Sequence, residues 1–403
     1  MGACARRLAA FTSILLVAGC VRLIPEVHGP SVPSAPVARP PESAVSAGLR
    51  YGPSVGSLGM SRGDAAQALA SFRDSCPRLV ARQDSSGLTR SGDWMPACQA
   101  APVWSSGPED FFARYFETAQ VGDGQAYVTG YFEPEIAGAR RRQPGFDIPV
   151  YAMPPDLVRA KPGDAPPLEN GQPPLGRYDS NGQFVPYHDR AAIEDGALMG
   201  RGLEIAWATD PVEFFFLQVQ GSGRLRAPDG SMMRIGYAGQ NGLPYTGIGA
   251  LMRERGLIGD GPGQYSGSMQ GIMRYLREHP EEGRALMREN RSWIFFREVT
   301  GANGAGTVGA VGALGVPLRR ESSVAADPRF VPLGAPVWLD LDRREAGGLW
   351  IAQDTGGAIK GSNRFDSFWG ADADARQIAG GMSARGNALL LLPKGTLNRL
   401  GAR

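Results

Sequence analysis

Apolar residues in several segments recur with the 3.6-residue period of a helix. Over residues 64–76, one face of a predicted helix is formed by apolar positions at offsets 0, 4, 7 and 11, namely Ala65, Leu69, Phe72 and Cys76. A second helix is predicted to begin at Pro108, because proline suits the first helical turn and two acidic residues follow it there. The same period predicts helices over 248–255, 269–277 and 281–288.

Short β-rich runs bounded by turn residues predict strands, and these dominate the C-terminal part of the chain. They cover residues 126–132, 148–151, 293–296, 336–341, 348–353 and 388–392. Pro228-Asp229-Gly230 predicts a hairpin turn between runs 214–220 and 232–237, although the apolar run 214–217 is equally compatible with a helix. The Pro/Gly-rich stretch 161–186 is expected at the surface. The glycine-rich segment 301–315 is expected to be a loop at a domain boundary, because it lacks the strand-to-helix setting of a dinucleotide site.

Length and composition indicate a folded protein of two domains. The chain has 403 residues, of which 42% are hydrophobic and 20% charged, so it can form real cores and is not disordered. Its 42 basic and 40 acidic residues nearly cancel, which argues against nucleic acid as a partner. The three histidines show no metal-ligand spacing, so neither a metal nor a cofactor is expected and carboxylates remain as the general acids and bases.

The N-terminus is typical of an exported lipoprotein. Arg6 and Arg7 precede an apolar run over 8–18 that is too short to span a bilayer and fits a secretory signal. The run ends in Val17-Ala18-Gly19-Cys20, which resembles a lipobox, so we expect cleavage after residue 19 and acylation of Cys20. The alternative is an ordinary signal peptide with an incidental cysteine. Residues 20–55 form a Pro-rich tether.

Two cysteines remain in the exported protein once Cys4 leaves with the signal and Cys20 takes lipid. Cys76 and Cys98 form an even pair in an oxidising compartment, which favours a disulfide between them. Two buried free thiols are the alternative.

The richest candidate chemistry is a pair of aspartates around a glycine-rich turn. Asp354 and Asp366 lie twelve residues apart, with Lys360 between them and aromatic side chains beside Asp366. Burial among such neighbours raises the pKa of a carboxyl group, and an acid that is protonated near neutral pH suits cleavage of a glycosidic bond. On the pattern alone, such aspartates are more often turn formers than catalysts.

This C-terminal segment resembles the three-aspartate domain of the MltA family of lytic transglycosylases. Asp327, Asp354 and Asp366 fall on its three signature positions. Further motifs resemble the family in the same order: Val128-Thr129-Gly130-Tyr131-Phe132-Glu133-Pro134, Ile148-Pro149-Val150-Tyr151, Gln220-Gly221-Ser222-Gly223 and Tyr237-Ala238-Gly239-Gln240-Asn241-Gly242. The resemblance covers residues 126–392. Gln240 departs from the family, which commonly has lysine there.

The resemblance implies a mainly β fold with helices. A double-psi β-barrel domain would comprise residues 56–131 and 299–403, and a second β-rich domain would be inserted at 132–298. A groove between the two domains would hold a peptidoglycan glycan strand. Val21 rather than aspartate follows Cys20, which is typical of an outer-membrane rather than an inner-membrane lipoprotein, so the expected location is the periplasmic face of the outer membrane, with the lipid in its inner leaflet. No particular cell-wall synthesis or division complex is indicated as a partner.

The resemblance also implies the site. Asp366 would be the single catalytic acid, and Asp354 and Asp327 would orient it or shape its charge. Tyrosines 131, 237 and 245 are candidates to stack on sugars, and candidates to hydrogen-bond the glycan are Gln220, Ser222 and Asn241. For all six, hydrogen bonding within the core is the alternative.

One carboxylic acid is sufficient for the implied reaction. It protonates the oxygen between N-acetylmuramic acid and N-acetylglucosamine, and its carboxylate then takes the proton of the muramyl C6 hydroxyl, which closes a 1,6-anhydro ring. Asp354-Thr355-Gly356 also matches the aspartic-protease signature, but the chain has no second copy. A non-catalytic glycan-binding lipoprotein is the alternative from another functional class.

Overall fold

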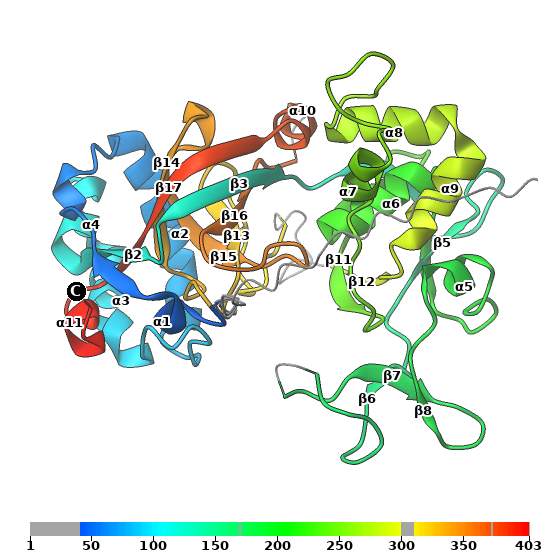
Figure 1. Ribbon diagram of the computed structural model, residues 1–403, viewed down its shortest axis with the longest axis horizontal. Coiled ribbons are helices and arrows are strands. Elements are labelled where there is room, and N and C mark those ends of the chain that lie inside the picture. Colours follow the sequence, from blue (N-terminus) through cyan, green and yellow to red (C-terminus); the bar gives the residue numbers. More distant parts are fainter. Residues whose placement is uncertain (1–40, 169–170, 300–309, 372–373, 403) are drawn as a thin grey trace, which may run out of the picture. The chain divides into compact units, whose positions relative to one another are not determined.

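The computed structural model describes residues 41–168, 171–299, 310–371 and 374–402, and Figure 1 shows it as a ribbon. The predicted signal peptide, Cys20 and the tether as far as residue 40 lie outside these residues. The predicted extent of the tether to residue 55 is wrong, because helix α1 and strand β1, which pairs with β2, lie within 44–51. The fold is mixed α/β, with two large β-sheets and a small third one. Its helical content is therefore higher than the expected mainly β architecture implied.

The first sheet is built from both ends of the described chain. Its eight strands run in the order β1-β2-β17-β14-β15-β13-β16-β3. Their bounds are β1 (Leu49–Tyr51), β2 (Phe116–Val121), β3 (Gln125–Tyr131), β13 (Ser323–Ala326), β14 (Pro336–Leu341), β15 (Gly348–Asp354), β16 (Arg364–Phe368) and β17 (Ser383–Pro393). The long strand β17 pairs with β14 and β2 and also with β3 (Figure 1). The pairings β3-β16-β13-β15-β14-β17 thus close on themselves.

The second sheet lies entirely within the middle of the chain. Its order is β12-β11-β10-β4-β9-β5. The strands are β4 (Glu135–Ala139), β5 (Ile148–Tyr151), β9 (Glu204–Ala208), β10 (Ser222–Arg226), β11 (Met232–Gln240) and β12 (Ile294–Glu298). The predicted surface stretch 161–186 holds more structure than expected. It contributes two strands to a third sheet of β6 (Val158–Arg159), β7 (Leu175–Tyr178) and β8 (Phe184–Val185).

The predicted hairpin turn is confirmed, and of the two alternatives for run 214–217 the structure shows the helix. The arms of the hairpin are β10 and β11, which flank Pro228-Asp229-Gly230. The run 214–220 belongs instead to helix α6 (Pro211–Gln220). Capping explains this outcome, because Asp210 accepts hydrogen bonds from the first-turn amides and Gly221 ends the helix with a left-handed φ of 78°.

The other helices include every one that the apolar period predicted. They are α1 (Ala44–Ala47), α2 (Arg62–Leu79), α3 (Met95–Ala100), α4 (Pro108–Tyr115), α5 (Arg190–Glu194), α7 (Ile248–Glu254), α8 (Met269–Glu278), α9 (Pro280–Glu289), α10 (Ala375–Gly380) and α11 (Thr396–Leu400). Short 3-10 helices cover Val55–Ser57, Ser91–Trp94, Ala101–Val103 and Arg344–Ala346. The predicted apolar face of α2 is buried, and it packs with the aromatic side chains of α4 against Leu349 and Ile351 of β15.

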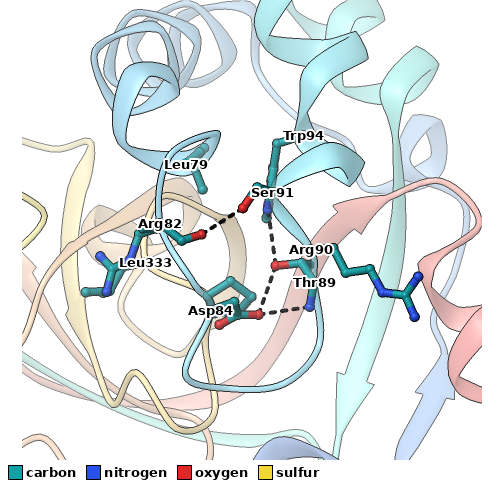
Figure 2. A pocket seen from close by; sticks show the side chains of 9 residues that line it. Leu79, Arg82, Asp84, Thr89, Arg90, Ser91, Trp94 and Leu333 are labelled. Atoms are coloured by element: carbon teal, nitrogen blue, oxygen red, sulfur yellow. Dashed lines mark hydrogen bonds between the residues drawn. The ribbon is translucent and has the colours of Figure 1, made fainter.

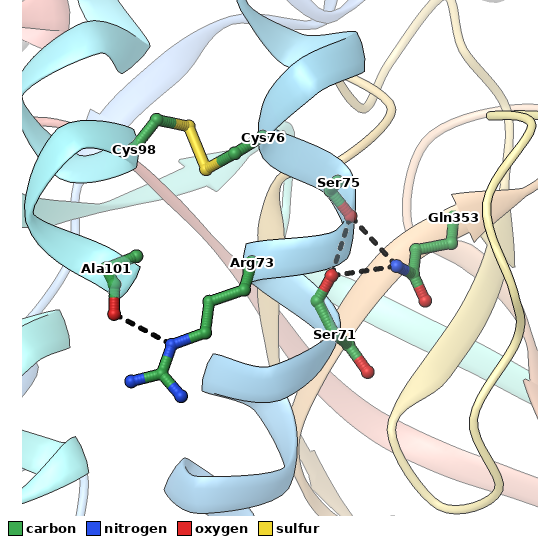
Figure 3. The surroundings of a disulfide bond; sticks show 7 residues. All are labelled: Ser71, Arg73, Ser75, Cys76, Cys98, Ala101 and Gln353. Carbon is green, nitrogen blue, oxygen red and sulfur yellow. Dashed lines mark hydrogen bonds between the residues drawn. A yellow bond between two sulfur atoms is a disulfide. The ribbon is translucent and has the colours of Figure 1, made fainter. Parts of the chain in front are cut away.

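A disulfide and a buried polar network fasten α2 to its surroundings (Figure 3). Cys76 of α2 is bonded to Cys98 of α3, 22 residues away, and a loop of that size is worth about 3 kcal/mol of stability. On the opposite side of α2, the Gln353 carboxamide donates to the Ser71 carbonyl and the Ser75 hydroxyl. Its oxygen accepts from Ser323 at 2.5 Å. The network fixes the strand position immediately before Asp354.

A small cavity beneath the end of α2 is structural (Figure 2). Its volume of about 10 Å³ holds no more than one water. The polar groups on its wall bond one another, since Asp84 accepts from the backbone and hydroxyl of Thr89, and that hydroxyl accepts from Trp94. The cavity is therefore too small to be a ligand site, and these polar groups on its wall already have hydrogen-bond partners within the protein.

Candidate active site

Two of the three predicted aspartates lie in one row across the first sheet. Ala325 of β13 pairs with Asp354 of β15 on one side and with Asp366 of β16 on the other. Residues directly opposite each other in a sheet point to the same face, so both carboxyl groups lie above Ala325. Neighbouring strands are about 4.8 Å apart, which separates the two aspartate backbones by about 10 Å. A register shift between Val324 and Ala325 brings Asp354 into this row.

The row continues onto β3, where Thr129 pairs with Asp366. The Thr129 hydroxyl donates to Asp366 Oδ1 at 2.5 Å and accepts from Arg364 Nη2 at 2.9 Å. Thr129 was not singled out from the sequence. Its place two residues before Tyr131, on the same strand face, was the available signal.

Asp366 is partly buried, and its surroundings hold its pKa at about 6. Burial is the largest cause of this rise, and the negative charge of Asp354 adds to it. The hydrogen bond from Thr129 and the positive charge of Arg364 act in the opposite direction. A carboxyl group with this pKa is available as a proton donor near neutral pH, as a general acid must be.

Both carboxylate oxygens of Asp354 accept hydrogen bonds within the protein. Oδ2 accepts from the Tyr131 hydroxyl at 2.9 Å, and Oδ1 accepts from the backbone N–H of Ala313 at 2.8 Å. Burial raises the pKa of Asp354, while these hydrogen bonds oppose the rise. Asp354 is thus held as a fixed neighbour of Asp366.

Asp327 has a different environment, although it belongs to the same motif. Its side chain is only 1% exposed and is ion-paired to Arg329, with Oδ2 to Nη2 at 2.8 Å. It also accepts from the backbone N–H of Gly361 at 2.9 Å. Burial alone raises the pKa of Asp327, but the bonds from Arg329 and Gly361 outweigh it and the pKa is lowered. Asp327 therefore holds the loop between the other two aspartates and stays ionised.

Two of the six candidates for sugar contact are buried and use their polar atoms within the protein. Tyr131 is 8% exposed, packs on Phe368 with ring centroids 5.1 Å apart, and orients Asp354. Asn241 is fully buried, and its amide donates to the carbonyls of His188 and Arg291 and accepts from the Trp293 N–H. The polar atoms of both side chains form hydrogen bonds within the protein interior, as buried polar groups usually do.

The other four candidates keep some exposure. Gln220 and Ser222 are partly buried, and the Gln220 carboxamide accepts from the backbone N–H of Phe132 at 3.0 Å. Tyr237 and Tyr245 are 52% and 39% exposed. Burial and the negative charge of Asp366 both raise the pKa of Tyr245, so this tyrosine of the inserted segment lies within electrostatic reach of the aspartate row.

The described part of the chain contains neither a metal-binding cluster nor a membrane-spanning helix. Residues 41–402, outside the gaps already given, hold no group of three or more His, Cys, Asp or Glu side chains placed to bind a metal ion. In the same residues, none of the helices has the length and hydropathy needed to span a bilayer.

Comparison with known proteins agrees with this arrangement. Residues 127–297 match the MltA specific insert domain, and residues 322–392 match the 3D domain. The sequence is 30% identical over 294 residues to a membrane-bound lytic murein transglycosylase A of Vibrio cholerae, covering 69% of this chain and 70% of the relative.

Two solved structures extend the likeness to the fold. A membrane-bound lytic murein transglycosylase from Agrobacterium tumefaciens superposes with a TM-score of 0.73 at 28% identity, covering 88% of this chain and 99% of that one. Escherichia coli MltA with bound chitohexaose gives a TM-score of 0.58 at 28% identity, with 82% and 89% covered. With these matches, the chain belongs to the MltA family of lytic murein transglycosylases.

Proposed function

We propose that the protein cleaves the β-1,4 bond between N-acetylmuramic acid and N-acetylglucosamine in peptidoglycan and leaves 1,6-anhydromuramic ends. The observation that carries this proposal is the environment of Asp366, whose pKa of about 6 results chiefly from burial. Family membership supports the lytic transglycosylase activity, and the chitohexaose bound to the E. coli relative supports a glycan as the ligand class.

The two halves of the reaction place opposite demands on Asp366. Its acid form first protonates the glycosidic oxygen, and an oxocarbenium-like centre develops at the muramyl C1. Its carboxylate then accepts the proton of the C6 hydroxyl, whose oxygen bonds to C1 and closes the anhydro ring. A pKa near 6 suits both steps, because neither form of the group is rare near neutral pH.

Asp354 is unsuited to be the second carboxylate of an ordinary glycosidase. Such a residue must offer a free oxygen to water or to the sugar. Both oxygens of Asp354 are engaged, by Tyr131 and by Ala313. We therefore assign Asp354 an electrostatic role, in which its charge raises the pKa of Asp366.

We assign the closed cycle of six strands to a double-psi β-barrel, formed by residues 56–131 and 299–403, with residues 132–298 inserted. Several contacts join the two parts. The backbone N–H of Glu133 donates to the Gly370 carbonyl at 2.8 Å, and Arg376 of α10 forms an ion pair with Glu213 of α6 at 2.9 Å. We place the glycan groove along this junction, where Tyr245 approaches Asp366.

The location follows from the N-terminus and the family. We infer that Cys20 carries lipid and holds the enzyme at the periplasmic face of the outer membrane. The V. cholerae relative is named membrane-bound, which supports an anchor. A Cys20→Ser variant is expected in the soluble periplasmic fraction, because loss of the acyl chains removes the main source of membrane affinity. Fractionation with the membrane would contradict this anchoring.

Mass spectrometry of purified sacculi incubated with the protein tests the activity. Release of anhydro-muropeptides is expected, and it should be lost in Asp366→Asn. Muropeptides with reducing ends would show a hydrolase instead. Unchanged sacculi that retain bound protein would show a glycan-binding lipoprotein without activity.

A further inference from the structure

The guanidinium of Arg364 is hydrogen-bonded to Thr129 in the row that contains Asp366 and Asp354. Arg364 lies two residues before Asp366 on β16, so both side chains point to the same face of the sheet. Its Nη2 donates to the Thr129 hydroxyl at 2.9 Å, and its Nη1 donates to the backbone carbonyl of Phe365. The guanidinium also stacks on Tyr127, 4.8 Å from the ring centroid. No carboxylate among the described residues lies within ion-pair distance of it.

The direction of the hydrogen bonds through Thr129 is fixed by the chemistry of the two ends. A hydroxyl has one proton to donate, and a guanidinium has no acceptor. Thr129 therefore accepts from Arg364, and it donates its own proton to Oδ1 of the ionised Asp366 carboxylate, which has no proton to give, at 2.5 Å. A hydrogen bond polarised by a cation is stronger than one between neutral groups.

This relay determines which oxygen of Asp366 carries the catalytic proton. In a protonated carboxyl group, the carbonyl oxygen is the better acceptor. The bond from Thr129 thus selects Oδ1 as the carbonyl oxygen and leaves the proton on Oδ2. When the proton has been transferred, the same bond stabilises the resulting carboxylate for the second half of the reaction.

We propose that Arg364 is a positioning residue of the transglycosylase, which acts on Asp366 through the Thr129 hydroxyl and never contacts the substrate itself. This inference rests on the function proposed above for Asp366. It assigns Arg364 two effects: it orients the proton of the acid, and it balances the negative charge of Asp354.

The charged and titratable groups around Asp366 set the expected change in pH dependence. Asp354 on β15 is the neighbouring negative charge, Arg364 on β16 is the positive charge, and Tyr131 and Tyr245 face the carboxyl group as neutral phenols. Loss of Arg364 leaves Asp354 unopposed, so the pKa of Asp366 should rise.

Arg385 provides a matched control, because its guanidinium stacks on the same tyrosine, Tyr127. Strand β17 places Arg385 across from Tyr127, with its guanidinium 4.9 Å from the ring centroid. Arg385 is exposed, and no hydrogen bond joins its side chain to the described residues of the aspartate row. Arg364→Gln and Arg385→Gln therefore remove the same charge from the same tyrosine, but only the first breaks the relay.

The test is the pH profile of anhydro-muropeptide release, with kcat and KM measured separately. For Arg364→Gln we expect kcat to fall about 10- to 100-fold, KM to change less than about threefold, and the alkaline limb to move to higher pH. Arg364→Lys should return the limb toward that of the unmodified enzyme, and Arg385→Gln should leave the profile unchanged. In a Thr129→Val background, where the relay is already broken, Arg364→Gln should lower kcat little further, while the loss of its charge should still move the limb.

Three results would overturn this role for Arg364. If Arg364→Gln raises KM and leaves kcat unchanged, Arg364 contacts the substrate. If Arg364→Gln leaves the alkaline limb unmoved, Arg364 does not act on the acid. If Arg385→Gln has an equal effect, the effect is a general one of charge. Thermal unfolding identifies any variant that fails to fold. If Arg364→Gln is such a variant, the pH profiles of Arg364→Lys and Thr129→Val test the role of Arg364 instead. Failure of the proposed function is separate, since it would appear as full activity of Asp366→Asn.

Discussion

Asp327, which directly follows strand β13, and Asp366, in the middle of strand β16, both belong to the 3D domain, but their carboxyl groups have opposite surroundings. Asp327 is paired with a guanidinium and accepts a backbone N–H, and its pKa is lowered. Asp366 has one hydroxyl donor and a second carboxylate nearby, and its pKa is raised to about 6. Burial opposes ionisation at both positions, so the hydrogen-bond partners decide which group holds a proton.

The largest expected effect separates the two aspartates by activity. Asp366→Asn keeps the size of the side chain but removes the transferable proton, so anhydro-muropeptide release should fall about 10²- to 10⁴-fold. Asp327→Asn should reduce release only as far as it reduces the folded fraction. Rates normalised to folded protein measure this difference, and equal losses in both variants would abolish the distinction.

The pH dependence of stability should separate them next. The pKa of Asp366 is about 6 in the folded protein and about 3.9 when unfolded, so its contribution is fully present below pH 4 and is lost as the pH rises through 6. The loss amounts to about 3 kcal/mol. Urea unfolding at pH 4 and pH 8 should therefore show a smaller difference in Asp366→Asn than in the unmodified protein. An unchanged difference would contradict the raised pKa.

Asp327 should show a smaller effect of opposite sign. Because its pKa is lowered on folding, its contribution is present above the unfolded pKa of about 3.9 and is lost as the pH falls through the folded value. At neutral pH, Asp327→Ala should lower the free energy of unfolding by about 1–3 kcal/mol, since Gly361 and Arg329 lose their acceptor. Asp340→Ala, at an exposed strand position, should cost less than about 0.5 kcal/mol. If the two substitutions lowered the free energy of unfolding equally, the structural role assigned to Asp327 would be contradicted.

The smallest expected effect concerns the fixed neighbour of the acid. Tyr131→Phe deletes the hydrogen bond to Asp354 and keeps the packing against Phe368. Asp354 should then ionise less readily and repel the Asp366 carboxylate less, so the alkaline limb should move to lower pH, opposite to Arg364→Gln. We expect a loss of activity of about tenfold or less. A shift of the limb to higher pH would show that Asp354 does not act through its charge.

The helices were predictable because their information is local. The spacing of apolar positions identified α2. Helix α4 was identified by the proline and the two acidic residues in the first turn of α4 itself. The ambiguity between strand and helix at 214–217 has the same origin, since a run of four apolar residues has no period and only the flanking caps at Asp210 and Gly221 determine the helix.

The aspartates of the candidate site could be singled out from the sequence, but their geometry could not. Motif resemblance singled out the three aspartates, but Thr129 lies 237 residues from Asp366 in sequence, and only the pairing of β3 with β16 brings them together. Residue type also does not specify the direction of a side chain. Tyr131 and Asn241 therefore matched a sugar-binding pattern while their polar atoms are bonded within the protein.

Titration of the aspartate carboxyl carbons by ¹³C NMR tests the central contrast most directly, in protein labelled at aspartate and assigned with Asp366→Asn and Asp327→Asn. The signal lost in Asp366→Asn should titrate near pH 6, and the signal lost in Asp327→Asn should titrate below the ordinary aspartate range. Titration of Asp366 at or below about 3.9, the ordinary value, would contradict the account, because the group would then be ionised throughout the range in which a general acid is needed.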